Sequence, residues 1–291
     1  MSIGLLLRTV VYLRAKQAFY QVKYRIRIPG YVALEAPTME VPQLDAPNIL
    51  KCKCLEDDKF SFLNMEHKFT GWYFTGNGML WAYNQNFFDW INQEGFSKEE
   101  GCKWIDQFIE DLPNNKVGLD PYPIALRSIN WVKFFCRFPD AATKSRLDAL
   151  YSQMRLLEKK LEYHLLGNHL LEDAYALYTG ATFFSDIRLL NKTEELIMDQ
   201  LKEQVLSDGA HFEQSPMYHC ILLDRLLDCI NIRETKVLVS YAQRMLGHLE
   251  SIIWTDGSIP MLNDSANGIA PTPKQIFDYV NALDWSGSPS Q

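Results

Sequence analysis

The stretch LEYHLLGNHLLEDAYAL (161–177) ends one predicted helix and begins the next. Gly167 follows an apolar run, and a glycine inside a helix costs roughly 1 kcal/mol relative to alanine, so it favours a helix end at this point. Asn168 is among the residue types that best cap the helix that follows. Two helices joined by so short a connection pack as an antiparallel hairpin, and the junction therefore predicts a helix-on-helix architecture.

The helical pattern continues on both sides of this junction, from about residue 78 onward. Connections are short, and several carry Pro, Gly or Asn, which end helices. Strand signals are few, so the predicted fold class is all-α, made of antiparallel helical hairpins. The helices are predicted near residues 79–94, 98–111, 122–138, 142–164, 168–184, 189–206, 214–230, 235–254 and 272–284.

The first 60 residues differ from the rest of the chain in composition and periodicity. We predict an N-terminal unit, 1–60, ahead of the helical domain, 61–291. Within it, residues 28–60 carry four prolines and little periodicity, which predicts extended chain that wraps the surface, with one or two short strands. Before Glu35 every charged residue is basic, and apolar residues lie between them. The basic residues are Arg8, Arg14, Lys16, Lys23, Arg25 and Arg27.

This pattern predicts a basic amphipathic helix over residues 1–27. Such a helix either lies on a membrane surface or a partner, or docks its apolar face on the domain. We favour docking. Arg8 and Arg14 interrupt the apolar run that a signal peptide needs, no convincing cleavage site follows, and no segment reaches the roughly 20 apolar residues that span a bilayer. The expected location is therefore cytoplasmic, with the periplasm as the alternative.

Composition narrows the class of function. The 291 residues carry a formal net charge of -7, which argues against nonspecific binding to nucleic acid. Cys52 and Cys54 form a C-x-C motif, but no second pair or nearby histidine completes a zinc site. No phosphate-binding glycine loop and no metalloprotease or serine-hydrolase motif is present. We expect neither a metal nor another cofactor.

Three predicted hairpins begin near residues 122, 168 and 214. Helices that start at equivalent phases of such a repeat begin on the same rim of the array. The stretches PYPIALRSINW (121–131), LLGNHLLEDA (165–174) and SPMYH (215–219) should therefore lie near one another. The spacing therefore predicts that the three polar stretches form one candidate site.

Each stretch has a structural and a functional interpretation. Asn168 and His169 either cap a helix or point their donors at an anion such as a carboxylate. Ser215 and Pro216 are the expected N-cap and first residue of a helix. Arg127 makes either a structural ion pair or a bidentate contact to a carboxylate.

Together these stretches resemble the N-terminal helical domain of the heparinase II/III family of polysaccharide lyases, particularly members found with bacterial surface-polysaccharide genes. The resemblance spans nearly the whole chain. It implies an incomplete α/α toroid that cleaves uronate-containing chains by β-elimination. The matching stretches are LWAYNQNFFDWI (80–91), PYPIALRSINWVKFF (121–135), LEYHLLGNHLLEDAYAL (161–177), DGAHFEQSPMYHCILLDRLLD (208–228) and WTDGSIPMLNDSANGIAPTP (254–273).

The resemblance assigns Asn168 to neutralising the uronate carboxylate, His169 to assisting it and Tyr218 to proton transfer. Masking the carboxylate matters because the C5 proton is poorly acidic beside its charge, and donors aimed at developing charge are worth about 3–4 kcal/mol each. A tyrosine needs cationic or donor neighbours to act as a base, but acts as an acid without them. The expected substrate-binding residues are Trp81, Asn84, Tyr122, Arg127, Asn130, Trp131, His211, Glu213 and Gln214.

In the family, a β-sandwich domain normally follows the toroid and adds a catalytic histidine, whereas this sequence ends at WSGSPSQ (285–291) without a β-rich region. We therefore expect a β-sandwich partner, as a domain or a separate chain, that completes the site on an acidic polysaccharide. The alternative is a non-catalytic glycan-binding or assembly module in surface-polysaccharide production. A third hypothesis, a helical scaffold for protein partners, predicts that Asn168, His169 and Tyr218 are far apart or buried.

Overall fold

The computed structural model describes residues 13–26 and 29–283 of the chain. The ends of two predicted helices, residues 1–12 and residue 284, lie outside the described residues, as does the junction 27–28. The helices are α2 (Ala15–Ile26), α3 (Met79–Phe87), η1 (Asp89–Asn92), α4 (Lys98–Asp111), α5 (Pro121–Arg137), η2 (Pro139–Ala141), α6 (Lys144–Lys160), α7 (Gly167–Phe183), α8 (Ile187–Gln204), α9 (Pro216–Ile232), α10 (Lys236–Ile252) and α11 (Pro273–Ala282).

These elements confirm the all-α fold class and, from α4 onward, match the predicted helices to within a few residues. The predicted helix 79–94 is wrong in one respect, because it is broken at Phe88. That residue adopts a left-handed conformation, with φ 60° and ψ 24°, and ends α3 before η1 begins. Its fully buried ring stacks on Trp72 with centroids 5.2 Å apart, so aromatic packing stabilises the break.

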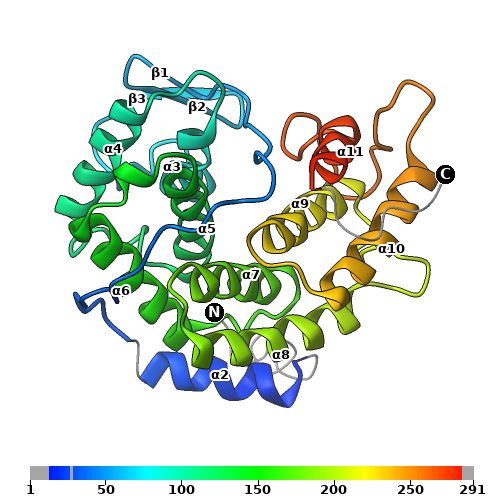
Figure 1. Cartoon of the computed structure of the whole chain (residues 1–291), viewed down its shortest axis with the longest axis horizontal. Helices are drawn as coiled ribbons and strands as arrows, with labels where there is room; N and C mark the ends of the chain where they lie inside the picture. The colour runs from blue at the N-terminus through cyan, green and yellow to red at the C-terminus, as the bar shows by residue number, and fades with distance from the viewer. Residues whose placement is uncertain (1–12, 27–28, 284–291) are drawn as a thin grey trace, which may run out of the picture.

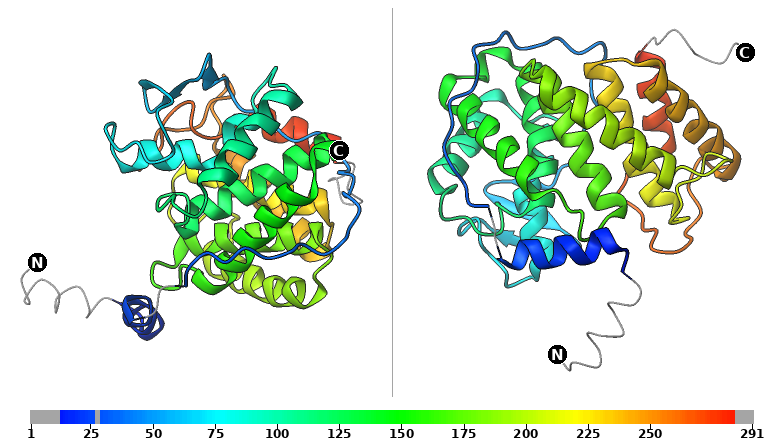
Figure 2. Two further views of the ribbon diagram at one scale, coloured as in Figure 1. Left: turned by 90° about the vertical axis from the view of Figure 1, so that its left-hand side faces the viewer. Right: turned by 90° about the horizontal axis from the view of Figure 1, so that it is seen from below.

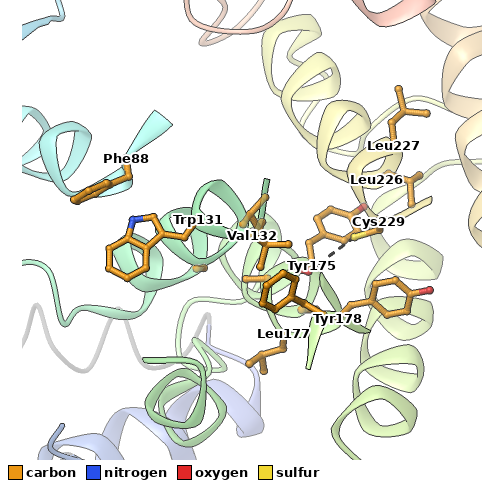
Figure 3. Close-up of a cluster of buried hydrophobic side chains, with 14 of the residues drawn as sticks. Phe88, Trp131, Val132, Tyr175, Leu177, Tyr178, Leu226, Leu227 and Cys229 are labelled. Atoms are coloured by element: carbon orange, nitrogen blue, oxygen red, sulfur yellow. Dashed lines mark hydrogen bonds between the residues drawn. The ribbon is translucent and has the colours of Figure 1, made fainter. Parts of the chain in front are cut away.

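The hairpins form a curved array with an inner and an outer layer of helices (Figure 1). Most residues of the inner helices α5, α7 and α9 are buried, whereas the outer helices α6, α8 and α10 bury one face. The inner helices share one apolar core, in which Trp131 and Val132 of α5, Tyr175 of α7 and Leu226 of α9 lie in a row (Figure 3). This is the architecture of an incomplete α/α toroid.

A small antiparallel sheet lies at one end of the array, with strands β1 (Leu55–Glu56), β2 (Lys59–Phe62) and β3 (Met65–Lys68) in the order β1-β2-β3. Two-residue turns join the strands, and all four turn residues have positive φ, the geometry that suits the twist of a hairpin. Phe60 of β2 is fully buried against Trp90 and Trp104. The predicted boundary at residue 60 falls within β2.

Residues 29–54, which we name the strap, run along α6, approach α9 and turn back to the sheet (Figure 1). The backbone N–H of Leu34 donates to Ser152 Oγ of α6 over 2.8 Å. Further along, Asn231 of α9 pairs with both backbone groups of Ala46, accepting from its N–H over 3.0 Å and donating to its C=O over 2.8 Å. The N–H of Lys51 then donates to the C=O of Asn92 over 3.1 Å. The strap therefore ties the last inner helix to the first hairpin.

Helix α2 docks beneath the junction that precedes α7, which agrees in part with the favoured interpretation that its apolar face docks on the domain (Figure 2). The ring of Tyr20 lies 4.6 Å from that of Tyr163, and the hydroxyl of Tyr24 donates to the C=O of Leu161 over 2.6 Å. No residue of α2 is fully buried, however, so this contact covers only part of the helix.

Asn231 offers a direct test of the strap. In Asn231→Ala both backbone groups of Ala46 lose their buried partners, and a buried unpaired group costs about 1–3 kcal/mol. Urea unfolding should therefore show a free energy of unfolding lower by about 2–4 kcal/mol. The exposed Asn191 on α8 gives the control, since Asn191→Ala should change the free energy of unfolding by less than about 0.5 kcal/mol. Equal effects of the two variants would show that the strap is not tied to α9.

Candidate active site

The N-terminal ends of the three inner helices meet, as the spacing of the hairpins predicts. Tyr122 is the second residue of α5, Asn168 the second of α7 and Tyr218 the third of α9. The ring centroids of Tyr122 and His169 are 4.6 Å apart. A Cβ added to Gly167 would lie 3.7 Å from Oε1 of Glu213, so the segment before α9 lies against the start of α7. The scaffold hypothesis, which requires these residues to be dispersed or buried, is not supported.

Asn168 does not cap α7, so the structural interpretation of this residue is wrong. The N-cap is Leu166, with φ 63° and ψ -157°, a region that side-chain-bearing residues seldom adopt and that costs about 1–3 kcal/mol. Gly167 follows with φ 60°, and the helix has already begun at Asn168. Within the described residues no hydrogen bond engages the half-exposed Asn168 amide. Its donor is therefore available to a ligand at the helix N-terminus.

A side-chain relay fixes α7 to the turn before α9. Gln204 at the end of α8 donates through Nε2 to the C=O of Gly167 over 2.9 Å, and its Oε1 lies 3.1 Å from Nε2 of His211. The N–H of His211 donates to Nδ1 of His219, whose Nε2 donates to the C=O of Met245. Both histidines are buried. His211 was expected to bind substrate, and this is corrected. The side chain is buried and joins Gln204 to His219, so it stabilises the turn before α9.

Gly209, in the turn that leads to this relay, has a structural reason to be glycine. Its φ is 87°, and a Cβ there would clash with the backbone carbonyl of Arg244. Ser215 is the N-cap of α9, as predicted, and accepts from the N–H of Tyr218. A second loop secures this cap, because Oγ of Ser265 lies 3.1 Å from Oγ of Ser215 and accepts from the N–H of Met217.

His169 is held by a carboxylate that the sequence analysis missed. Its Nδ1 lies 3.1 Å from Oε2 of Glu162, which is itself buried. Burial alone would lower the pKa of His169, but the hydrogen bond and charge of Glu162, with the charges of Glu172 and Glu213, raise it. The protonated imidazole is therefore more favoured beside Asn168 than in a free histidine. The only sequence signal was an acidic residue in the short junction before α7, which also carries His164.

Tyr218, like His169, lies near carboxylates. Burial, followed by the charges of Glu213 and Asp264, raises its pKa above the ordinary 10. Burial and the charge of Asp264 also raise the pKa of Glu213, against the opposing effect of His169. The phenol of Tyr218 is therefore protonated at neutral pH. Asp264 was not predicted, although it lies in the matching stretch 254–273.

Arg127 does not face the site, which corrects its expected role in substrate binding. Its side chain is fully buried and packs over the ring of Phe108 at 4.3 Å. Nε donates to Gln153, and the two terminal nitrogens donate to the backbone carbonyls of Asn86 and Gly118. No carboxylate of the described residues forms an ion pair with Arg127, and burial lowers its pKa to about 9. It stabilises the first hairpins.

Asn130, Trp131 and Trp81 are also fully buried, so their predicted substrate contacts are wrong. Asn130 donates to Oδ1 of Asp89 over 2.6 Å and to the C=O of Phe87 over 3.0 Å. Trp131 belongs to the core in Figure 3, and Nε1 of Trp81 donates to the C=O of Met65. Asn130 and Trp81 therefore bind backbone carbonyls, and Trp131 packs in the core, so none of the three faces a ligand.

Asn84 and Gln214 keep accessible side chains. Asn84 lines a cavity of about 250 Å³ between the strap, α3 and the start of α11, together with Lys51, Asp89 and Gln275. Gln214 is exposed, has φ 54° and accepts through its C=O from Nδ2 of Asn263 over 2.7 Å. Among the described residues, no three His, Cys, Asp or Glu side chains are grouped to hold a metal ion.

Comparisons with known proteins indicate one family and one fold. The family profile for the heparinase II/III N-terminus matches residues 127–283. A heparin-sulfate lyase from Pedobacter heparinus is 24% identical over 300 aligned positions, which cover 87% of this chain and 44% of that protein. The chain thus spans less than half the length of this relative.

Two solved structures share the fold at low identity. A crystal structure of heparinase III has a TM-score of 0.51 at 14% identity, covering 92% of this chain and 51% of that one. The heparinase III-BT4657 gene product has a TM-score of 0.52 at 14% identity, covering 73% of this chain and 40% of that one. Both support the arrangement of the hairpins.

The pairing of Glu162 with His169 predicts a measurable pKa change. Glu162→Gln removes the charge that raises the pKa of His169, so this pKa should fall, because burial then prevails. Proton NMR titration of the histidines measures the shift. Glu195→Gln, at an exposed position on α8, should leave the titration of His169 unchanged. A pKa that stays raised in Glu162→Gln would contradict the pairing.

We expect the fold to lose stability in acid because of two buried histidines, His211 and His219. Burial lowers the pKa of both His211 and His219 to about 4, against 6.5 in the unfolded chain. The unfolded state therefore takes up protons first, so stability is intact above pH 6.5 and falls as the pH drops toward 4. The loss is up to about 3 kcal/mol for each histidine. In His219→Gln the pH dependence of the free energy of unfolding between pH 6.5 and 4 should be shallower, and an unchanged slope would contradict this assignment.

Proposed function

Because this chain belongs to the heparinase II/III N-terminal family, we propose that it is the toroid part of a polysaccharide lyase that cleaves uronate-containing acidic glycans by β-elimination. The observation that carries the proposal is that Asn168, His169 and Tyr218 lie at the adjoining ends of two neighbouring inner helices. These residues provide an amide donor, an imidazole with a raised pKa and a protonated phenol.

The start of α7 is suited to the uronate carboxylate. The amide of Asn168 lacks a partner in the described residues, and the raised pKa of His169 makes its cationic form more accessible than in a free histidine. Backbone N–H groups at the helix N-terminus add to this positive potential. Masking the carboxylate makes the C5 proton acidic enough to be removed, and donors of this kind are worth about 10²–10³ in rate.

The start of α9 is suited to the leaving group. In β-elimination a base removes the C5 proton, the freed electron pair forms the C4–C5 double bond, and the C4–O bond breaks. The leaving oxygen then takes a proton. A tyrosine whose pKa is raised by Glu213 and Asp264 is a poor base and holds the proton that this step requires. We assign Tyr218 as the acid.

The base then comes from elsewhere in the complete enzyme. The relative from Pedobacter heparinus is more than twice the length that this chain covers, which leaves room for a second domain. We propose that such a domain, in the same polypeptide or a separate one, closes over the rim and supplies the base. A side chain carried on a mobile domain would meet the C5 proton only after the glycan is bound.

The alternative is a non-catalytic glycan-binding module, because the described residues supply an assigned acid, Tyr218, and no assigned base. In either function, a bound acidic polymer must overcome the negative charge of the chain. Glu213 and Asp264 place negative charge beside Tyr218, on a chain whose formal net charge is already -7. The carboxylates of Glu213 and Asp264 would repel an acidic polymer over a Debye length, roughly 10 Å at 0.1 M salt. A binding module would keep Asn168 and His169 but would not need the proton of Tyr218.

An assay for the unsaturated product distinguishes the lyase from the glycan-binding module. The chain, alone and with a β-sandwich partner, is mixed with uronate polysaccharides, and the unsaturated product is followed by its ultraviolet absorbance. Tyr218→Phe should lower the rate about 10²–10⁴-fold, and Asn168→Ala about 10²–10³-fold. Circular dichroism should show unchanged helical content.

The partly buried Tyr241 on α10 gives the matched control, because Tyr241→Phe removes a hydroxyl away from the inner helices. Its rate should equal that of the wild type. Glycan binding that persists in Tyr218→Phe, with no product in any combination, would favour the binding module. Full activity in Tyr218→Phe would remove the proposed acid.

A further inference from the structure

Helix α2 has a second face that its docking leaves uncovered. The docked face carries Tyr20, Tyr24 and Gln17, which contact the segment 161–165. Phe19, Val22 and Ile26 lie on the other side of the helix, where their exposed fractions are 62%, 56% and 81%. Their spacing of three and four residues places them in one stripe along a helix. Three adjacent exposed apolar side chains need a different explanation from a scattered single one.

Basic residues flank this stripe. At 100° per residue, Lys23 lies along one edge of it and Arg25 along the other. Lys23 lies 4.8 Å above the ring of Tyr20, and no carboxylate pairs with either side chain in the described part of the chain. The sequence contains no acidic residue before Glu35, although the whole chain has a formal net charge of -7. Positive charge is therefore concentrated around one apolar stripe.

We propose that α2 lies on an anionic lipid surface, with Phe19, Val22 and Ile26 at the boundary between headgroups and acyl chains. Lys23 and Arg25 would then reach the headgroup phosphates on either side of the stripe. The geometry is that of a helix parallel to the bilayer. In the described residues, no helix combines the length and apolar character that crossing a bilayer requires.

A lipid surface fits these features better than a glycan does. A polysaccharide offers hydroxyl and carboxylate groups, which would leave the aliphatic parts of Val22 and Ile26 unmatched. A bilayer interface presents an apolar layer bordered by negatively charged headgroups. The apolar layer matches the apolar stripe, and the headgroups match the basic residues on either side of it. Tyr20 and Tyr24 meanwhile fasten the helix to the domain, so the contact would hold the whole toroid at the membrane.

Vesicle co-sedimentation tests the proposal with the full chain. Vesicles of phosphatidylcholine with phosphatidylglycerol should bind the protein, and vesicles of phosphatidylcholine alone should bind it much less. Rising salt should weaken the binding. Phe19→Asp combined with Ile26→Asp should reduce the affinity at least about tenfold. Lys23→Gln and Arg25→Gln should each reduce it about fivefold.

Ile187→Asp gives the matched control, since Ile187 is 63% exposed on α8, and this variant should bind as the wild type does. Circular dichroism verifies that each variant is folded. Equal binding to both kinds of vesicle, or undiminished binding by the double variant, would overturn the proposal. Binding of an acidic polysaccharide that depends on Phe19 and Ile26, without vesicle binding, would assign the face to a glycan instead. None of these outcomes depends on lyase activity.

Discussion

The fold depends on the buried charge of Arg225. This guanidinium lies between the inner helices, with Nε 3.6 Å from Oε2 of Glu172 on α7. Its Nη1 lies 3.4 Å from Oδ2 of Asp224 and 3.5 Å from Oδ2 of Asp228, both on its own helix. Burial opposes its charge, yet the three carboxylates and Asp89 raise its pKa further, so it stays protonated. An uncompensated charge at this depth would cost several kcal/mol. The inner helices can therefore pack only in the register that brings these groups together.

Asp228 extends this constraint to the rest of the chain. Its Oδ2 accepts from Lys133 of α5 over 2.8 Å, and its Oδ1 accepts from Asn48 of the strap and from Tyr279 of α11. One carboxylate thus joins the first inner helix, the last inner helix, the strap and the final helix. Glu172 is less well paired, and burial raises its pKa to about 7. Because register is fixed in the middle of α5, α7 and α9, their N-terminal ends meet at one level, where the candidate site lies.

Sequence periodicity predicted the helices well because each hairpin is local, and its caps and breakers lie within a few residues. The shared rim followed from repeat spacing, which is why Asn168, His169 and Tyr218 were found together. Arg127 and Trp131 were misplaced because α5 is buried on all sides, so periodicity could not distinguish a site-facing side from a core-facing one. Glu162 lies only seven residues before His169, but a carboxylate in a short junction does not show by its position which side chain it pairs with. The pairing of Arg225 with Glu172 was missed because it joins two helices that are distant in sequence, and spacing within one helix does not encode such a contact.

The charges around the site divide it into two halves. On the α7 side Glu162, Glu172 and Glu213 raise the pKa of His169 against the effect of burial, so this side can carry a cation. On the α9 side burial, Glu213 and Asp264 raise the pKa of Tyr218, which stays protonated. A uronate bound with its carboxylate toward α7 would place its leaving oxygen toward α9, where a proton is available. The reverse orientation would bring the carboxylate against two others. In the proposed lyase, the carboxylates that repel an acidic polymer therefore also set its direction, and the same repulsion keeps Tyr218 an acid rather than a base.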